Sequence, residues 1–261
     1  MGSSAPVPPG AERAPALLIS IVSHGHGAMV QRLLHQLALP CAAICIARVV
    51  LTRNIPESAP VPPPQGWPFV LQIIDNPAPL GFGANHNQAL QGAVEPFVCV
   101  LNPDVELLDE EPFAALIEAA RCEGVGCAYP LQVDGQGRVQ DSEREIPTPL
   151  ALWRRRVLRR PQQRVDWVNA ACIVMPLRVW QAVKGFDEAY FMYCEDVDLC
   201  LRIRLLGLGL QRADARVVHA GQRASGRQWR HLAWHVRSLL RLWGSRTCRQ
   251  AVRLPGGNRL Q

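Results

Sequence analysis

Three carboxylates stand close together in the second half of the chain. Glu195, Asp196 and Asp198 fall within four positions, and His219 follows about twenty residues later. Another acid, Asp104, comes directly after an apolar run and a proline. Two separated acidic groups and a histidine indicate a divalent metal ion and a general base. Such groups would serve the transfer of a chemical group away from a phosphate leaving group.

Each of these residues also has an ordinary structural explanation. Asp104 could cap the turn that follows it, and acids at a helix start interact favourably with the helix dipole. A lone histidine such as His219 is most often a core or surface residue. The apolar residues on both sides of 195–198 favour the chemical interpretation, because a carboxylate in apolar surroundings has a raised pKa.

Short apolar runs alternate with helical patterns along the chain, which predicts an α/β fold with a mostly parallel central sheet flanked by helices. We expect strands at 17–23, 47–52, 69–75, 97–101, 124–133, 165–175 and 210–219, and helices at 29–37, 85–94, 111–122, 176–183, 195–206 and 225–242. Asp134–Gly137 predicts a hairpin turn. Polar residues follow four of the strands: Ser23-His24, Arg53-Asn54, Asp75-Asn76 and Asn102-Pro103-Asp104. Ligands of such sheets bind beyond the carboxyl ends of the strands, so these residues outline one cleft.

Length and composition limit the class of protein. A chain of 261 residues, 48% hydrophobic and 19% charged, is typical of a globular protein with one large domain or two small ones. We expect a catalytic domain over 16–222, preceded by a disordered leader, 1–15. A basic helical tail rich in tryptophan and arginine, 223–261, follows it.

The net charge of +6 comes almost wholly from arginine, since Lys184 is the only lysine. Guanidinium groups match phosphate oxygens, so nucleotides, lipid phosphates and nucleic acids are candidate partners. A GC-rich genome would explain the arginines equally well. No nucleic-acid recognition module is present in the sequence, so we expect no nucleic-acid partner. The tail would either lie on an anionic membrane surface or dock on the domain with its arginines outward.

The sequence predicts a cytoplasmic protein, with peripheral contact at the inner face of the cytoplasmic membrane left open. No apolar run approaches the ~20 residues of a membrane span. The first residues lack the apolar centre of a signal peptide. Nine scattered cysteines, none in a CxxC pair, predict reduced and mostly buried thiols.

Five segments together resemble glycosyltransferase family 2, and within it bacterial rhamnosyltransferase-like enzymes. The resemblance extends from about residue 17 to residue 221. The segments are Ser20–Ser23 (SIVS), Leu80–Asn87 (LGFGANHN), Leu101–Asp104 (LNPD), Gly185–Glu188 (GFDE) and Tyr190–Cys200 (YFMYCEDVDLC). Their order and spacing make the match specific.

The resemblance implies a GT-A fold and an inverting transfer from a nucleoside diphosphate sugar, dTDP-rhamnose-like or a UDP-sugar. The acceptor would be a hydroxyl of a glycan or lipid-linked molecule in cell-wall or other cell-surface polysaccharide synthesis. It implies a divalent metal, Mg²⁺ or Mn²⁺, at Asp104 with His219. Asp196 matches the catalytic base, with Glu195 the next candidate. Nucleotide contacts fall on Ser23, His24, Asn54, Asn85 and Asn102, and sugar or acceptor contacts on Trp167 and Asn169.

Two positions depart from the family pattern. Asn102 replaces the first acid of the Asp-x-Asp metal motif, which argues against tight metal binding. Thr52-Arg53-Asn54 stands where many members place an acid that holds the nucleotide, so Asn54 would take over that hydrogen bond or the nucleotide selectivity differs.

Two other classes of function stay open. A catalytically impaired nucleotide-sugar-binding partner in a glycan assembly complex would explain Asn102. A nucleotidyltransferase would share the cleft and the metal. It would also need a lysine- or arginine-bearing glycine-rich signature after the first strand, which His24–Gly27 does not supply.

Overall fold

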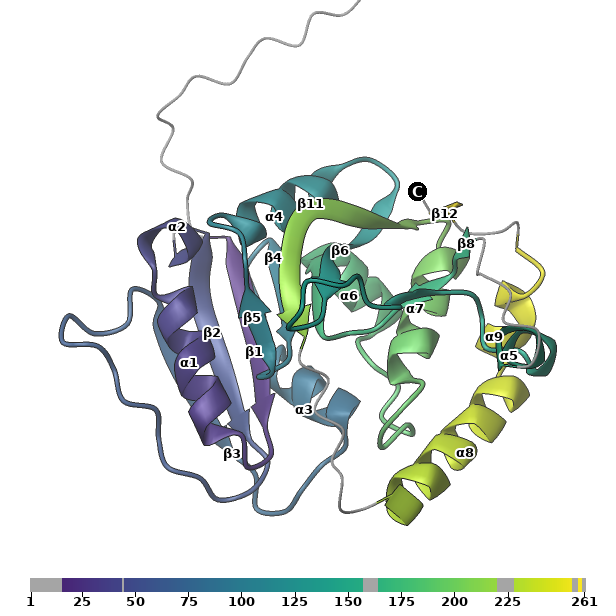
Figure 1. Cartoon of the computed structure of the whole chain (residues 1–261), viewed down its shortest axis with the longest axis horizontal. Coiled ribbons are helices and arrows are strands. Elements are labelled where there is room, and N and C mark those ends of the chain that lie inside the picture. The colour runs from purple at the N-terminus through teal and green to yellow at the C-terminus, as the bar shows by residue number, and fades with distance from the viewer. Residues whose placement is uncertain (1–15, 44, 157–163, 220–227, 255–257, 260–261) are drawn as a thin grey trace, which may run out of the picture.

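The computed structural model describes residues 16–43, 45–156, 164–219, 228–254 and 258–259, and the predicted leader lies outside them (Figure 1). An eight-stranded sheet has the strand order β3-β2-β1-β4-β10-β6-β11-β5. Its strands are β1 (Leu17–Ser23), β2 (Ile46–Arg53), β3 (Val70–Asp75), β4 (Phe97–Leu101), β5 (Val105–Leu107), β6 (Val125–Val133), β10 (Cys172–Pro176) and β11 (Gly209–His219).

The direction of the strands brings the predicted polar ends to one edge of the sheet. β3, β2, β1 and β4 pair in parallel, and so do β6 and β11. β10 runs antiparallel between β4 and β6, so the carboxyl ends of all six parallel strands share that edge. The α/β prediction with a mostly parallel sheet is therefore confirmed.

Helices cover both faces of the sheet. They are α1 (Gly27–Leu37), α2 (Pro40–Ala43), α3 (Phe82–Ala89), α4 (Pro112–Arg121), α5 (Pro149–Arg156), α6 (Leu177–Val183), α7 (Glu195–Leu205), α8 (Gln228–Gly244) and α9 (Arg246–Ala251). Alternate residues of β1 point to opposite faces: Leu17, Ile19 and Ile21 join the cluster of α1 and α4, and Leu18 joins the cluster of α3, α6 and α7.

The predicted strand 165–175 is wrong, because the structure divides it into β8 (Arg164–Val165), β9 (Trp167–Val168) and β10. Buried Asp166 accepts hydrogen bonds from the Ile146 amide and from Arg164. The Asn169 side chain bonds Gln132. These polar side chains turn the backbone away from a continuous ladder. β9 pairs instead with β7 (Glu143–Arg144), and β8 pairs with β12 (Asn258–Arg259).

Other differences are smaller. β5, α5 and α9 were not predicted from the sequence. The turn after β6 is confirmed, since the Gly137 amide donates to the Asp134 carbonyl at 2.9 Å. Eight cysteines within the described ranges carry free thiols, and Cys122 alone among these eight is exposed. None of the described helices combines the length and apolar character needed to cross a membrane. The division into domain and tail at 222–223 stays a prediction.

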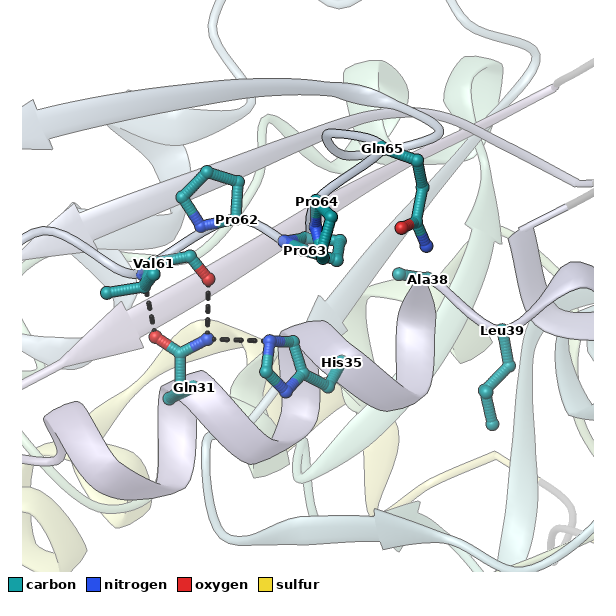
Figure 2. A pocket seen from close by; sticks show the side chains of 9 residues that line it. All are labelled: Gln31, His35, Ala38, Leu39, Val61, Pro62, Pro63, Pro64 and Gln65. Carbon is teal, nitrogen blue, oxygen red and sulfur yellow. Dashed lines mark hydrogen bonds between the residues drawn. The ribbon is translucent and has the colours of Figure 1, made fainter.

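A proline-rich loop, 61–65, lies against α1 (Figure 2). The Gln31 side chain accepts from the Val61 amide and donates to the Val61 carbonyl, both at 2.8 Å. The same amide group contacts His35 at 2.9 Å. A hollow of about 530 Å³ remains between helix and loop, and its lining carries no acid. It offers no group for the chemistry considered above.

Candidate active site

The acidic α7 start is preceded by a turn in an unusual conformation. Tyr193 and Cys194 have φ angles of 70° and 65°, in the left-handed region that L-residues rarely adopt. The turn aims Glu195 and Asp196 into a pocket of about 490 Å³. The third acid, Asp198, does not line this pocket. It accepts a 2.7 Å hydrogen bond from Arg202 one helical turn further on, and so has a structural role.

Glu195 is a carboxyl group held away from water. It is 7% exposed, and its Oε2 atom has no hydrogen-bond partner among the described residues. Burial, followed by the nearby charge of Asp196, raises the pKa of Glu195 to about 8. At neutral pH this carboxyl therefore keeps its proton.

Asp196 lies beside it with a different balance of forces. Burial raises the pKa of Asp196 to about 6, and the Val197 amide and the charge of Arg144 oppose the rise. The Val197 amide donates to Oδ1 at 2.8 Å. The Arg144 guanidinium stacks over the Trp167 ring, 5.3 Å from its centre. The two neighbouring carboxyl groups titrate together, and the opposing effects of the Val197 amide and Arg144 favour Asp196 over Glu195 as the group that loses its proton first.

The two residues predicted to meet acceptor or sugar, Trp167 and Asn169, both line this pocket. Trp167 donates from its ring nitrogen to the Glu145 carbonyl at 2.8 Å, which fixes the plane of the indole. The Asn169 amide donates to Gln132 at 3.0 Å. The pocket thus combines an aromatic wall, a fixed amide and two carboxyl groups.

A second group of site residues meets at the same sheet edge. The pairing of β5 with β11 places His219 opposite Val105, next to Asp104. The His219 Nε2 atom lies 3.5 Å from an Asp104 carboxylate oxygen, and both side chains are partly exposed. No set of three or more His, Cys, Asp or Glu side chains among the described residues could hold a metal ion. The protein therefore offers a two-residue pair rather than a closed metal cage.

The backbone connects these two groups. The backbone N–H of Asn102 donates to the Ala171 carbonyl at 2.8 Å, and Leu101 on β4 pairs with Cys172 on β10. Asn169, three residues before Cys172, lines the carboxylate pocket. The Asp104–His219 pair does not line that pocket, so the structure puts the two acidic groups at one sheet edge without a shared cavity wall.

The predicted nucleotide-binding residues lie at the ends of β1, β2 and β4 and on α3, and Asn54 and Asn85 among them are engaged within the protein. Asn54 donates to the Leu80 carbonyl at 3.0 Å and accepts from the Leu80 amide at 2.8 Å. Its amide also contacts exposed His24 at 3.2 Å. Asn85 is fully buried and donates to the Gly81 carbonyl at 2.9 Å. These asparagines hold the loops in place, so any effect of theirs on a nucleotide passes through the loops.

Sequence reasoning missed Glu57. Its carboxylate accepts from the Ser23 hydroxyl and from the Gly25 amide, each at 2.7 Å, beside a hollow of about 460 Å³. It is the first acid after β2, and that position was the available signal, since the stretch 52–54, where many family members place an acid, has none. Arg144 was missed too, because it reaches Asp196 only through the unpredicted pairing of β7 with β9.

Comparisons with known proteins find chains that are similar in sequence and in fold. The chain is 28% identical over 256 residues to the N-acetylglucosaminyl-diphospho-decaprenol L-rhamnosyltransferase of Mycobacterium tuberculosis, covering 85% of this chain and 82% of that protein. It is 35% identical over 79 residues to the rhamnosyltransferase WbbL of Escherichia coli K12, covering 30% of each. No family model matches the chain.

A search of solved structures finds the mannosyltransferase PcManGT from Pyrobaculum calidifontis, in complex with GDP-Man and Mn²⁺. The TM-score is 0.60 at 13% identity, over 91% of this chain and 74% of that one. The fold is the GT-A fold, and the protein is a glycosyltransferase. Within that class, its similarity to these named rhamnosyltransferases supports a rhamnosyltransferase-like protein of glycosyltransferase family 2.

Proposed function

We propose that the protein transfers a sugar from a nucleoside diphosphate sugar, dTDP-rhamnose-like or UDP-linked, to a hydroxyl of a lipid-linked saccharide. The observation that carries the proposal is the pocket in which the carboxyl groups of Asp196 and Glu195 lie beside aromatic Trp167. The name of the Mycobacterium relative, which specifies a diphospho-decaprenol acceptor, supports this acceptor class. The reaction would belong to cell-surface polysaccharide synthesis on the cytoplasmic side of the membrane.

The proposed step is a single displacement with inversion. Asp196 takes the proton of the acceptor hydroxyl while that oxygen attacks the anomeric carbon of the donor sugar. The bond between the anomeric carbon and the diphosphate oxygen breaks, and the nucleoside diphosphate leaves with both bonding electrons. Asp196 ends the step protonated. Glu195, already neutral, adds no second negative charge beside the base and leaves Asp196 ionised.

Asp104 and His219 are the residues that would hold a divalent metal ion. Their carboxylate oxygen and imidazole nitrogen are donors that Mn²⁺ or Mg²⁺ accepts, and their 3.5 Å separation lets both reach one ion. The remaining coordination positions would fall to phosphate oxygens and water. Such an ion would supply positive charge against the leaving diphosphate.

The outer face of α8 fits an anionic membrane surface. Trp229, Leu232, Val236 and Leu240 follow helical spacing and are 84%, 52%, 47% and 60% exposed. From residue 215 to residue 261, arginine is the only residue type among Asp, Glu, Lys and Arg, so the charge complements acidic lipids. Contact of this face with the membrane would bring the pocket to a lipid-linked acceptor.

A transfer assay tests the proposed activity. The purified chain is given UDP-, dTDP- and GDP-sugars with Mg²⁺ or Mn²⁺ and a prenyl-diphosphate-linked N-acetylhexosamine, and the product is followed by mass spectrometry. We expect a lipid-linked disaccharide with one of these donors and none from Asp196→Asn. Failure of every donor, with nucleotide binding intact in a thermal-shift assay, would favour the impaired binding protein instead.

Vesicle sedimentation tests the membrane contact. We expect the chain to bind vesicles rich in phosphatidylglycerol, to release at high salt, and to bind more weakly as Trp229→Ser or Leu240→Ser. Val94→Ser removes an equally exposed apolar side chain at another place and serves as the control. Equal binding of all variants would remove α8 from the proposed surface.

A further inference from the structure

The turn that aims the two carboxyl groups has little to hold it within its own sequence. Two successive non-glycine residues, Tyr193 and Cys194, adopt positive φ angles there. Such a conformation is costly for L-residues and persists where surrounding contacts determine it. The contacts that hold it in this structure come from α3, whose Phe82 amide donates to the Phe191 carbonyl at 3.0 Å, and from α8 near the end of the chain.

Two hydrogen bonds join α8 to this turn. The Ser238 hydroxyl donates to the Met192 carbonyl at 2.8 Å. The Tyr193 hydroxyl and the His231 Nδ1 atom lie 2.8 Å apart, within hydrogen-bond distance. The first bond holds the backbone of Met192, and the second holds the side chain of Tyr193. The turn is thereby tied at two successive positions.

Ring contacts extend the same attachment. Phe191 and Trp234 have ring centres 5.1 Å apart, and the Tyr193 ring meets His235 edge to face at 5.1 Å. Further along α8, the Arg241 guanidinium lies 5.2 Å from the centre of the Tyr190 ring. Aromatic side chains therefore lock the turn against the inner face of α8.

The remainder of α8 contributes little to the core. Among the α8 side chains that the structure describes, Ser238 and Leu242 are the buried ones. In Figure 1 the helix lies at the side of the molecule, beside α5 and α9 and away from the sheet. The polar contacts of α8 go to the turn before α7 through His231 and Ser238, and to Asp187 and the Pro147 carbonyl through Arg241 and Trp243.

We propose that α8 is a positioning element for catalysis, holding the turn 190–194 through Ser238 and His231 so that Asp196 faces the acceptor hydroxyl. The inference rests on the proposed function of Asp196 as the base. It assigns to the C-terminal tail a role within the sugar-transfer step itself, in addition to membrane contact. Ser238 and His231 touch no reacting atom and act through Met192 and Tyr193.

The test compares Ser238→Ala, His231→Phe and the double variant with the full-length wild type. We expect kcat for transfer to fall about threefold in each single variant and about tenfold in the double variant, because each loses one hydrogen bond to the turn. The KM for the donor should stay within about twofold, since nucleotide contacts lie at β1 to β4. Ser238→Thr, which keeps the hydroxyl, should restore kcat.

A pH profile separates positioning from stability. In Ser238→Ala the loosened turn opens Asp196 to water, which moves the acid limb of the kcat profile to lower pH. Ala233→Ser changes an exposed residue of the same helix and should match the wild type in every respect. A double variant with wild-type kcat would overturn the proposal. So would a fall in kcat that follows the folded fraction and leaves the acid limb unmoved.

Asp196→Asn, assayed in parallel, distinguishes the positioning role of α8 from the proposed role of Asp196 as the base. An active Asp196→Asn enzyme would refute the base assignment itself. An inactive one, together with Ser238 and His231 variants that behave like Ala233→Ser, would refute the positioning role of α8 alone.

Discussion

The nucleotide side and the carboxylate side of this sheet edge treat their polar groups in opposite ways. On the nucleotide side, Asn54 and Asn85 bond the loop at residues 80–81, and the buried side-chain atoms of both have partners. Thr52 Oγ1, Asn76 Oδ1 and His86 Nε2 are buried on that side without a partner among the described residues. At the α7 start, a buried Glu195 carboxyl oxygen also lacks a partner among those residues, and the two residues before it have positive φ angles. Backbone strain beside a buried carboxyl group persists where it serves a ligand, so we infer that the second region carries the chemistry and that Asn54 and Asn85 hold loops.

Replacing the proposed base at the α7 start should have the largest effect on activity. Asp196→Asn removes the proton acceptor with little change in shape, so we expect kcat to fall about 10²–10⁴-fold. Nucleotide affinity, measured by calorimetry, should be unchanged because the base lies on the acceptor side. Normal turnover in this variant would show that another group takes the proton.

Removing either member of the Asp104–His219 pair should have the next largest effect. We expect Asp104→Ala and His219→Ala to weaken metal-dependent binding of the nucleoside diphosphate at least about tenfold, since a loss of about 1.4 kcal/mol is sufficient. Glu106→Gln, an exposed change on β5 directly after Asp104, is the control. Equal titrations for all four proteins would refute a metal site here.

Glu195 should make the stability of the folded chain depend on pH, because its carboxyl group is buried at the α7 start. Its pKa is about 8 in the folded chain against an ordinary 4.5, so the folded state holds a proton that the unfolded state has released between those pH values. Its burial therefore lowers stability progressively as pH rises through that window. Glu195→Gln should gain in melting temperature relative to wild type from about pH 5 to pH 8, by roughly 2–4 °C for each kcal/mol. A difference that is constant with pH would contradict the assignment.

The scaffold asparagines should show the reverse pattern. Asn85→Ala removes the side-chain hydrogen bonds to the Leu80 and Gly81 carbonyls and the acceptor of the Asn76 amide group, which should lower the free energy of unfolding by about 1–3 kcal/mol. The value of kcat per folded molecule should change least of all the variants. Urea denaturation measures the free energy of unfolding, and active-site titration gives kcat per folded molecule. An unfolding curve like that of the wild type would show that Asn85 does not stabilise the fold.

Local patterns predicted most of the sheet, since runs such as 17–23 and 97–101 need only apolar residues and turn signals. The acidic α7 start and Asp104 were also visible in the sequence, as residue types at recurring spacings. Contacts between distant segments were not. The β5–β11 pairing that brings Asp104 to His219 and the β7–β9 pairing that brings Arg144 to Asp196 depend on tertiary structure.

The same limit applies to the pKa values and to α8. An acidic cluster in apolar surroundings indicates a raised pKa, but which carboxyl keeps its proton depends on burial and on the position of Arg144. The amphipathic pattern of 225–242 left membrane contact and docking as alternatives. In the structure the inner face of α8 docks on the turn through Ser238, and its outer face is exposed.

The central claim is that Asp196, in its partly buried pocket, must lose its proton before transfer. The pH dependence of kcat/KM for the acceptor tests it in wild type and in Arg144→Gln, because this ratio reports ionisations of the free enzyme. Burial raises the pKa of Asp196 to about 6 and Arg144 lowers it, so the rate should rise through about pH 6, and at higher pH without the arginine. A profile flat through this range, or one that Arg144→Gln leaves in place, would contradict the account.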